Sequence, residues 1–207
     1  RLLDYDPAVW HMNEGHSAFL ALERIREKMK GGADFNKAWN EVKVSNVFTT
    51  HTPVPAGNDQ FPLWLVDKYF GNYWNELGLT HDQFIDLGRQ AQPWGESFVM
   101  PVLALKLSER ANAVSELHGI VSRRMWNFLW PEKDEEDVPI GYVTNGVHTR
   151  SWLARRMGVL FETYLGADWQ DRLDDPGFWN AIDNIPDEEL WAVRRHLKNK
   201  LVNFTNE

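Results

Sequence analysis

Short apolar runs alternate with longer stretches of helical periodicity along this chain, and the alternation predicts its secondary structure. Four runs are rich in apolar and β-branched residues, which is typical of strands. They cover residues 8–12, 42–50, 111–114 and 140–143. Apolar residues recur at helical spacing in residues 17–30, 34–41, 59–77, 80–87, 100–107, 116–129, part of 152–166, and 186–204. Because strands alternate with helices, we predict the α/β class with parallel strand pairing.

Residues that favour helix starts support several of these boundaries. Asp34, Thr80 and Ser115 are expected N-caps, because their side-chain oxygens can accept a free backbone N–H. Gln83 lies at the capping-box position relative to Thr80. Pro101 lies near the first position of its helix, where its missing N–H costs little.

Three polar stretches between these elements are predicted loops. Residues 53–58 contain two prolines and a glycine, which restrict and turn the backbone. Residues 88–97 are mostly polar, and residues 131–138 are acidic and begin with proline. The acidic stretch is the expected change of subdomain, so we predict one part over residues 1–139 and a second over 140–207.

Composition excludes several classes of function. The 207 residues are 43% hydrophobic and 25% charged, which is ordinary for a globular protein. A net charge of −8 argues against a nucleic-acid partner. Absence of cysteine excludes disulfides and thiolate-bound zinc and fits a cytoplasmic protein. The chain contains no run of 18 or more apolar residues, so no membrane span is expected. The first residue is arginine and the end reads as mid-helix, so we expect a piece of a longer protein, although a trimmed complete protein is the alternative.

A first polar block follows the first predicted strand. It contains His11, Asn13, Glu14 and His16, with Gly15 expected to turn the chain. In α/β proteins, ligand sites form where strands end, so these side chains are candidates for binding hydroxyl groups. The spacing is not that of a H-E-x-x-H zinc site. The structural alternative is that the block only begins the next helix.

Two further blocks follow later strands. His51 comes directly after a β-rich run and before the proline-braced loop, where its ring can be fixed by neighbours. Asn145 precedes Gly146, whose expected positive φ would expose the amide at a tight turn. The alternatives are a structural histidine and an ordinary Asn-Gly turn. The chain also holds 11 Trp, including Trp152, and tryptophan either stacks on sugars or packs in cores.

Four segments carry a resemblance to a known family. In order and spacing, WHMNEGHSAFLALERIRE, FTTHTPVPAGNDQF, NAVSELHGIVSRRMW and PIGYVTNGVHTRSWL resemble consecutive motifs of glycogen/maltodextrin phosphorylases, especially the compact bacterial and archaeal branch. The resemblance covers about residues 5–205. It implies the glycosyltransferase-B architecture, in which two Rossmann-like domains face a cleft. It also implies transfer of the terminal α-1,4-linked glucose of a glucan or maltodextrin to inorganic phosphate.

The resemblance implies roles for six residues. His51 and Asn145 match the catalytic residues that hold the 6-hydroxyl of the reacting glucose, and Thr52 lies along the same wall of the pocket. Glu14 and His16 match an acid–x–His pair beside the anomeric carbon. The larger enzymes have Asp at the position of Glu14, which suggests a changed contact.

The last of the six concerns the cofactor. Trp152 matches a tryptophan packed near pyridoxal 5′-phosphate, although the Arg-Arg-Trp run of the larger enzymes is Arg150-Ser151-Trp152 here. The segment with the lysine that binds this cofactor is not found in this chain. By the resemblance, residues 1–139 end the N-terminal domain and residues 140–207 begin the cofactor domain.

We therefore expect the 207-residue chain alone to be inactive and to expose apolar surface that favours self-association, as in a homo-oligomer. Two alternatives remain for the sequence. One is a fragment of a sugar-nucleotide-dependent glucan synthase, which would need a nucleotide-recognising segment. The other is a non-catalytic carbohydrate-binding module that uses its tryptophans.

Overall fold

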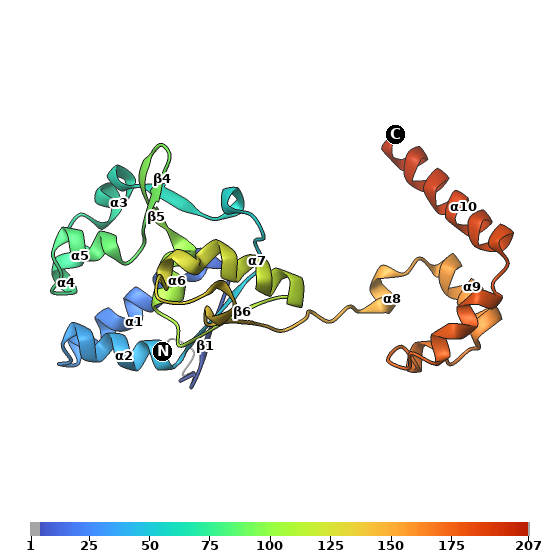
Figure 1. Cartoon of the computed structure of the whole chain (residues 1–207), viewed down its shortest axis with the longest axis horizontal. Coiled ribbons are helices and arrows are strands. Elements are labelled where there is room, and N and C mark those ends of the chain that lie inside the picture. Colours follow the sequence, from blue (N-terminus) through green and yellow to red (C-terminus); the bar gives the residue numbers. More distant parts are fainter. Residues whose placement is uncertain (1–4, 207) are drawn as a thin grey trace. The chain divides into compact units, whose positions relative to one another are not determined.

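The computed structural model describes residues 5–206 and forms two compact units (Figure 1). The first is Arg1–Asn145 and the second is Gly146–Glu207. The predicted boundary after residue 139 therefore falls within the first unit, just ahead of a strand that pairs there. The assignment of the two parts to domains of a longer enzyme stays a prediction.

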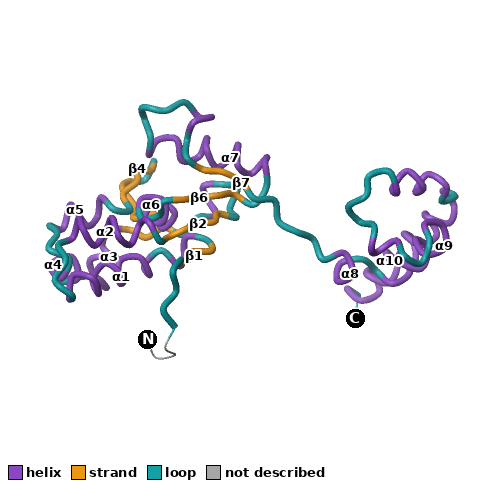
Figure 2. Tube along the Cα trace, turned by 90° about the horizontal axis from the view of Figure 1, so that it is seen from below, coloured by secondary structure: helices purple, strands orange, loops and turns teal. Residues whose placement is uncertain are grey.

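The first unit is built on a four-stranded parallel sheet (Figure 2). Its strands, in spatial order, are β1 (Trp10–Asn13), β2 (Asn46–Thr50), β6 (Arg110–Ala113) and β7 (Ile140–Tyr142). Since every pair is parallel, the prediction of an α/β fold with parallel pairing is confirmed. This sheet is consistent with part of a glycosyltransferase-B domain.

The two faces of this sheet differ in polarity. Residues in register lie on the same face, because side chains alternate along each strand. Met12, Phe48 and Ile140 are buried on one face. Asn13, Thr49 and Asn112 share the opposite face.

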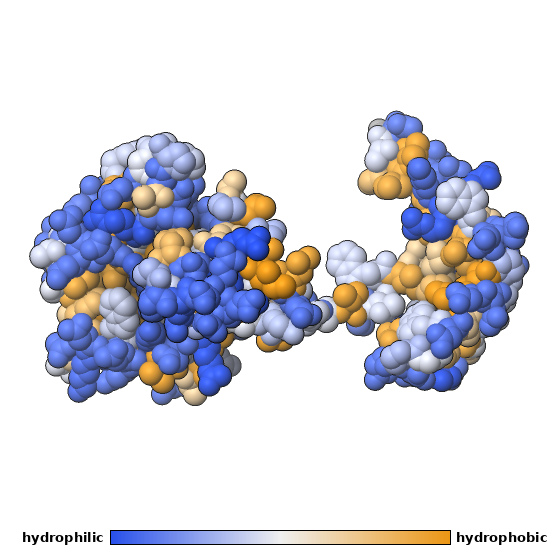
Figure 3. Space-filling model, viewed as in Figure 1, coloured by the Kyte–Doolittle hydropathy of each residue, from blue (hydrophilic) through white to orange (hydrophobic). Residues whose placement is uncertain are grey.

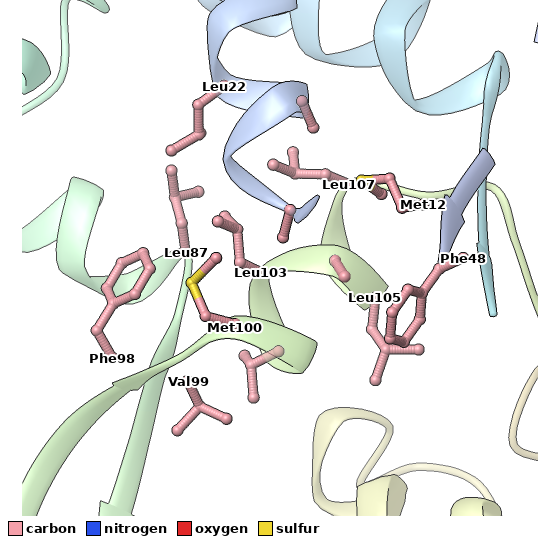
Figure 4. Close-up of a cluster of buried hydrophobic side chains, with 14 of the residues drawn as sticks. Met12, Leu22, Phe48, Leu87, Phe98, Val99, Met100, Leu103, Leu105 and Leu107 are labelled. Carbon is pink, nitrogen blue, oxygen red and sulfur yellow. The ribbon is translucent and has the colours of Figure 1, made fainter. Parts of the chain in front are cut away.

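Helices connect the strands. The element between β1 and β2 is a helical pair, α1 (Phe19–Lys30) and α2 (Phe35–Val44); α6 (Met100–Lys106) precedes β6, and α7 (Glu116–Trp126) joins β6 to β7. In α6, every residue from Met100 to Leu105 is buried, as expected for a helix that is apolar all round. Figure 4 shows Met100 and Leu103 of α6 in the core that also contains Met12, Phe48 and Leu107.

A smaller antiparallel sheet corrects two predictions. Its strands are β3 (Gln60–Pro62), β5 (Gly95–Val99) and β4 (Arg89–Gln92), in that order. The predicted loop at 88–97 is therefore a hairpin, which turns at Pro93 and Trp94; Gly95, which begins β5, has φ 126°. The predicted helix at 59–77 was wrong over its first residues, because Gln60–Pro62 pairs with β5. The remainder forms α3 (Leu63–Phe70) and α4 (Tyr73–Glu76), followed by α5 (His81–Asp86).

The start of β2 was also placed wrongly. The prediction began this strand at Val42, but α2 continues to Val44 and the strand begins at Asn46. Ala38 and Val42, four residues apart, are both fully buried on the inner face of α2. This packing outweighs the strand preference of the valines.

The predicted helix caps are confirmed. The Thr80 hydroxyl accepts the Gln83 backbone N–H, and the Gln83 side chain accepts the Thr80 backbone N–H, which completes a capping box. The side chains of Asp34 and Ser115 cap α2 and α7. Pro101 lies in the first turn of α6, as predicted.

The second unit is helical in its regular structure. It contains α8 (Thr149–Trp152), α9 (Arg155–Leu165) and α10 (Asp187–Thr205), so the helices predicted within 152–166 and over 186–204 are confirmed. Two small clusters hold α9, one around Leu160 with Ile185 and one around Trp169 with Phe178. No residue of α10 is buried, and Leu201 and Phe204 leave apolar surface near its end (Figure 3).

Six short 3-10 helices complete the secondary structure of residues 5–206: Gly15–Ser17, Pro55–Gly57, Asn127–Leu129, Glu135–Asp137, Trp169–Asp171 and Phe178–Asn184. None of the helices in the described part of the chain is long and apolar enough to cross a membrane.

Candidate functional site at the carboxyl edge of the parallel sheet

The sequence-predicted residues of the first unit follow the carboxyl ends of parallel strands. Glu14 follows β1, His51 and Thr52 follow β2, and Asn145 lies three residues beyond β7. Parallel strands end at the same edge of a sheet, and ligand sites of open α/β sheets form there. The Asn145 N–H donates to the Val114 carbonyl at 3.0 Å, which ties the segment after β7 to the end of β6.

The Glu14 carboxylate binds the start of the loop after β2. It accepts the backbone N–H of His51 at 2.7 Å and the Thr52 hydroxyl at 3.0 Å. It also accepts the Gly15 N–H at 3.2 Å and the Thr50 hydroxyl at 3.5 Å. Hydrogen bonds to a charged acceptor are the stronger kind, so this carboxylate joins the ends of β1 and β2.

Glu14, rather than Gly15, turns the chain after β1. Glu14 has φ 72° and ψ 164°, and it is the one non-glycine residue with positive φ among residues 5–206. The prediction of a turn at Gly15 was therefore wrong. Gly15 is required for space, since a Cβ there would lie 2.8 Å from Pro101 Cδ at the start of α6. The Glu14 conformation is one that glycine normally occupies, so it carries backbone strain that its hydrogen bonds must offset.

The His51 ring is held by the other residue at the end of β1. His51 Nε2 lies 2.7 Å from Asn13 Oδ1. An amide oxygen only accepts hydrogen bonds, so Nε2 carries the proton. In the neutral ring, Nδ1 is then left as an acceptor. His51 is exposed, which leaves it accessible to a ligand.

A chain of polar side chains crosses the same face of the sheet. His11 Nε2 lies 2.6 Å from the Thr49 hydroxyl, which donates to Asn112 Oδ1 at 2.9 Å. The Asn112 amide group in turn donates to the Ala113 carbonyl at 3.1 Å. Because the Thr49 proton is used on Asn112, His11 must be the donor in the first bond. Sequence analysis did not single out Thr49 or Asn112, since both lie within predicted strands, 42–50 and 111–114, rather than in the loops that follow them.

Several curated proteins that resemble this chain are phosphorylases. A maltodextrin phosphorylase of Thermococcus litoralis is 42% identical over 200 residues, which are 97% of this chain and 23% of that protein. A glycogen phosphorylase of Mycobacterium tuberculosis is 43% identical over 203 residues, 95% of this chain and 23% of the relative. A glycogen phosphorylase of Aquifex aeolicus is 35% identical over 198 residues, 96% of this chain and 28% of the relative. The chain belongs to the glycogen/maltodextrin phosphorylase family.

This membership confirms the resemblance of the four sequence segments to that family. The chain spans about a quarter of the length of these curated relatives. No protein-family model matches it.

Three predicted site residues make none of the hydrogen bonds described above for Glu14. His16 is exposed in the 3-10 helix that follows Glu14. Gly146 does not have the predicted positive φ, so Asn145 lies in a segment without the expected tight turn. Trp152 ends α8 in the second unit, where its side chain is 82% exposed.

Pyridoxal 5′-phosphate, the cofactor implied by the resemblance, would need binding groups that the carboxyl edge of the parallel sheet does not supply. A pyridoxal phosphate held as a Schiff base requires a lysine amine, and Glu14, His51, Thr52 and Asn145 supply none. The exposed indole of Trp152 could pack against the ring of this cofactor. Among residues 5–206, no group of three His, Cys, Asp or Glu side chains is arranged to hold a metal ion.

Proposed function

We propose that this chain supplies one wall of the glucose site of an α-glucan phosphorylase. In the proposed reaction, the bond from the anomeric carbon of the terminal glucose to the leaving glucan oxygen breaks. A bond from that carbon to a phosphate oxygen forms, and the leaving oxygen receives a proton. The products are glucose 1-phosphate and a glucan shortened by one residue. The observation that carries the proposal is the His51 ring, whose Nδ1 is left free to accept a hydrogen bond.

Each residue has one proposed task. His51 accepts the 6-hydroxyl proton of the reacting glucose through Nδ1, and the Asn145 side chain holds the same hydroxyl. Two fixed contacts on one hydroxyl orient the anomeric carbon, and such positioning can lower a barrier by several kcal/mol, on the order of 3 here. Thr52 and His16 line the same pocket. Glu14 supports this wall by binding the backbone of His51 and the Thr52 hydroxyl.

The remaining components lie beyond this edge of the sheet. Pyridoxal 5′-phosphate, when bound, supplies a phosphate group that exchanges protons with the substrate phosphate. The proposed place for Trp152 is beside this cofactor. In this proposal, residues 1–139 end the N-terminal domain and 140–207 begin the cofactor domain, in a cytoplasmic enzyme. The 207-residue chain alone is expected to release no glucose 1-phosphate.

The test uses a chimera of full enzyme length. The matching 200 residues of the Thermococcus litoralis maltodextrin phosphorylase are replaced by this chain, and phosphorolysis of maltodextrin is measured. We expect activity, with kcat/KM at least about 100-fold lower in His51→Ala and in Asn145→Ala, close to 3 kcal/mol of transition-state stabilisation.

Matched controls are His196→Ala and Asn75→Ala, which change exposed residues outside the segments that follow β1, β2 and β7 and are expected to leave kcat/KM unchanged. A folded chimera without phosphorolysis contradicts the proposal. Glucan elongation from a sugar nucleotide would then indicate a synthase, and maltodextrin binding that survives His51→Ala would indicate a carbohydrate-binding module.

A further inference from the structure

Asn13 and Glu14, two consecutive residues at the end of β1, both bind His51. The Glu14 carboxylate binds the His51 backbone N–H at 2.7 Å, and Asn13 Oδ1 binds the ring at Nε2, also at 2.7 Å. The first bond fixes the backbone where β2 ends. Only the second bond, from Asn13, fixes the ring. Glu14 therefore constrains the backbone of His51, and Asn13 constrains its side chain.

The register of the sheet explains why Asn13 reaches this ring. Asn13 pairs with Thr49, and His51 lies two residues after Thr49 along the chain. Side chains two residues apart point to the same side of an extended chain. Asn13 and His51 are therefore neighbours along one face, whereas Glu14 reaches the hydroxyls of Thr50 and Thr52 on the other side.

An exposed imidazole without an anchor would exchange between two neutral tautomers and several ring orientations. The partner of one ring nitrogen decides which nitrogen keeps the proton. The Asn13 oxygen accepts and cannot donate, so it keeps the proton on Nε2 and leaves the lone pair on Nδ1. A hydroxyl donor can bind Nδ1 only in that tautomer.

We propose that Asn13 is a positioning residue that sets the tautomer and orientation of His51, so that Nδ1 is presented as a hydrogen-bond acceptor. The use of that acceptor for a sugar hydroxyl rests on the proposed function. The tautomer itself is a property of this chain and can be measured without substrate.

His118 provides an internal reference for the measurement. Its Nδ1 accepts the Val114 N–H at 3.4 Å, so its neutral ring also carries the proton on Nε2. His118 is buried on α7, and its ring binds Val114, whereas the Asn13 side chain binds His51. A variant at Asn13 should leave the His118 signals unchanged if the first unit remains folded.

The first experiment is long-range ¹H–¹⁵N NMR of the histidine rings in the 207-residue chain at a pH where they are neutral. We expect His51 as the Nε2–H tautomer, and in Asn13→Ala we expect a mixture of both tautomers with His118 unchanged. Asn13→Asp keeps a hydrogen-bond acceptor at this position and should retain the Nε2–H tautomer. This variant therefore tests the proposal even if Asn13→Ala does not fold. An Nδ1–H or mixed His51 in the unchanged chain overturns the proposal, as does a pure Nε2–H form in Asn13→Ala.

The second experiment measures maltodextrin phosphorolysis in the chimera. Asn13→Ala should lower kcat/KM about 10-fold, Asn13→Asp should restore part of it, and Asn13→Ala should have no further effect in a His51→Ala background. A full additive loss in that background would place Asn13 outside the His51 contact. An inactive chimera would contradict the proposed function while the NMR result still decides the role of Asn13.

Discussion

The Glu14 carboxylate accepts the His51 backbone N–H at 2.7 Å from a main-chain conformation, φ 72° and ψ 164°, that side chains rarely tolerate. Strain at the end of β1 and order at the end of β2 are therefore connected through one side chain. Its four hydrogen bonds offset a backbone cost of roughly 1–3 kcal/mol.

Substitutions of Glu14 should separate the strain from the hydrogen bonds. Glu14→Ala removes the carboxylate but keeps a Cβ at positive φ, so its free energy of unfolding should fall by about 3 kcal/mol. Glu14→Gly removes the same bonds without the strain and should be about 1 kcal/mol more stable than the alanine variant. Urea denaturation of the first unit measures both.

The matched control is Glu41, an exposed residue within α2. There the order should reverse, with Glu41→Gly about 1 kcal/mol less stable than Glu41→Ala. Equal stabilities of the two Glu14 variants would show that the positive φ carries no strain.

Gly15 and Gly146 should respond oppositely to alanine. A Cβ on Gly15 would lie 2.8 Å from Pro101 Cδ and 3.0 Å from Pro101 N, so Gly15→Ala should cost about 1–3 kcal/mol of stability. Gly146 has no atom within 4 Å of such a Cβ and no positive φ, so Gly146→Ala should change stability by less than about 0.5 kcal/mol. Thermal unfolding compares the two, and a neutral Gly15→Ala would contradict the close packing on α6.

Thr49 should be important for stability through its hydroxyl. It is 6% exposed and bonds both His11 and Asn112. Thr49→Val keeps the shape but leaves both neighbours without this partner, which should cost about 2 kcal/mol in urea denaturation. The control is Thr163→Val, whose exposed hydroxyl bonds only Val159 O within α9, with a change below about 0.5 kcal/mol. Equal effects at the two sites would count against the chain of hydrogen bonds.

Glu23 should make part of the stability depend on acid pH. The hydrogen bond from the Arg26 guanidinium lowers the pKa of Glu23 below its ordinary value. A lowered pKa in the folded state stabilises the protein above the unfolded-state pKa, about 4.3, and this contribution disappears as pH falls through the folded pKa. Since the pair is partly exposed, we expect roughly 0.5 kcal/mol.

Glu23→Gln should therefore be less stable than the unchanged chain at neutral pH, and the difference should vanish in strong acid. Denaturation curves across the acid range measure it, with the exposed Glu132→Gln as control. A difference that stays constant with pH would mean that the Glu23 charge is not responsible.

Exposed apolar residues on α10 should promote self-association of the chain. Leu201 and Phe204 are 61% and 75% exposed, and no residue of this helix is buried. We expect light scattering to show a mass above that of one chain, which Leu201→Lys with Phe204→Lys reduces and Glu188→Lys does not. A clean monomer of the unchanged chain would refute this.

Local chemistry was sufficient for much of this protein. The caps at Asp34, Thr80 and Ser115 and the apolar helix after Pro101 follow from side chains within a few residues of one another, so sequence alone located them. The polar blocks also located the strand ends and led to the phosphorylase family, because such motifs are read in order along the chain.

Contacts between distant segments decided the rest. Burial of Val42 against the core kept it helical, and pairing of Gln60–Pro62 with β5 made a strand where helical spacing had been expected. The turn lies at Glu14, whose carboxylate binds the segment after β2, and Gly15 leaves the space that Pro101 occupies. Asn13 and Glu14 bind His51 across 38 and 37 positions of sequence. No periodicity encodes such bonds, because they exist only once the parallel register brings the two strand ends together.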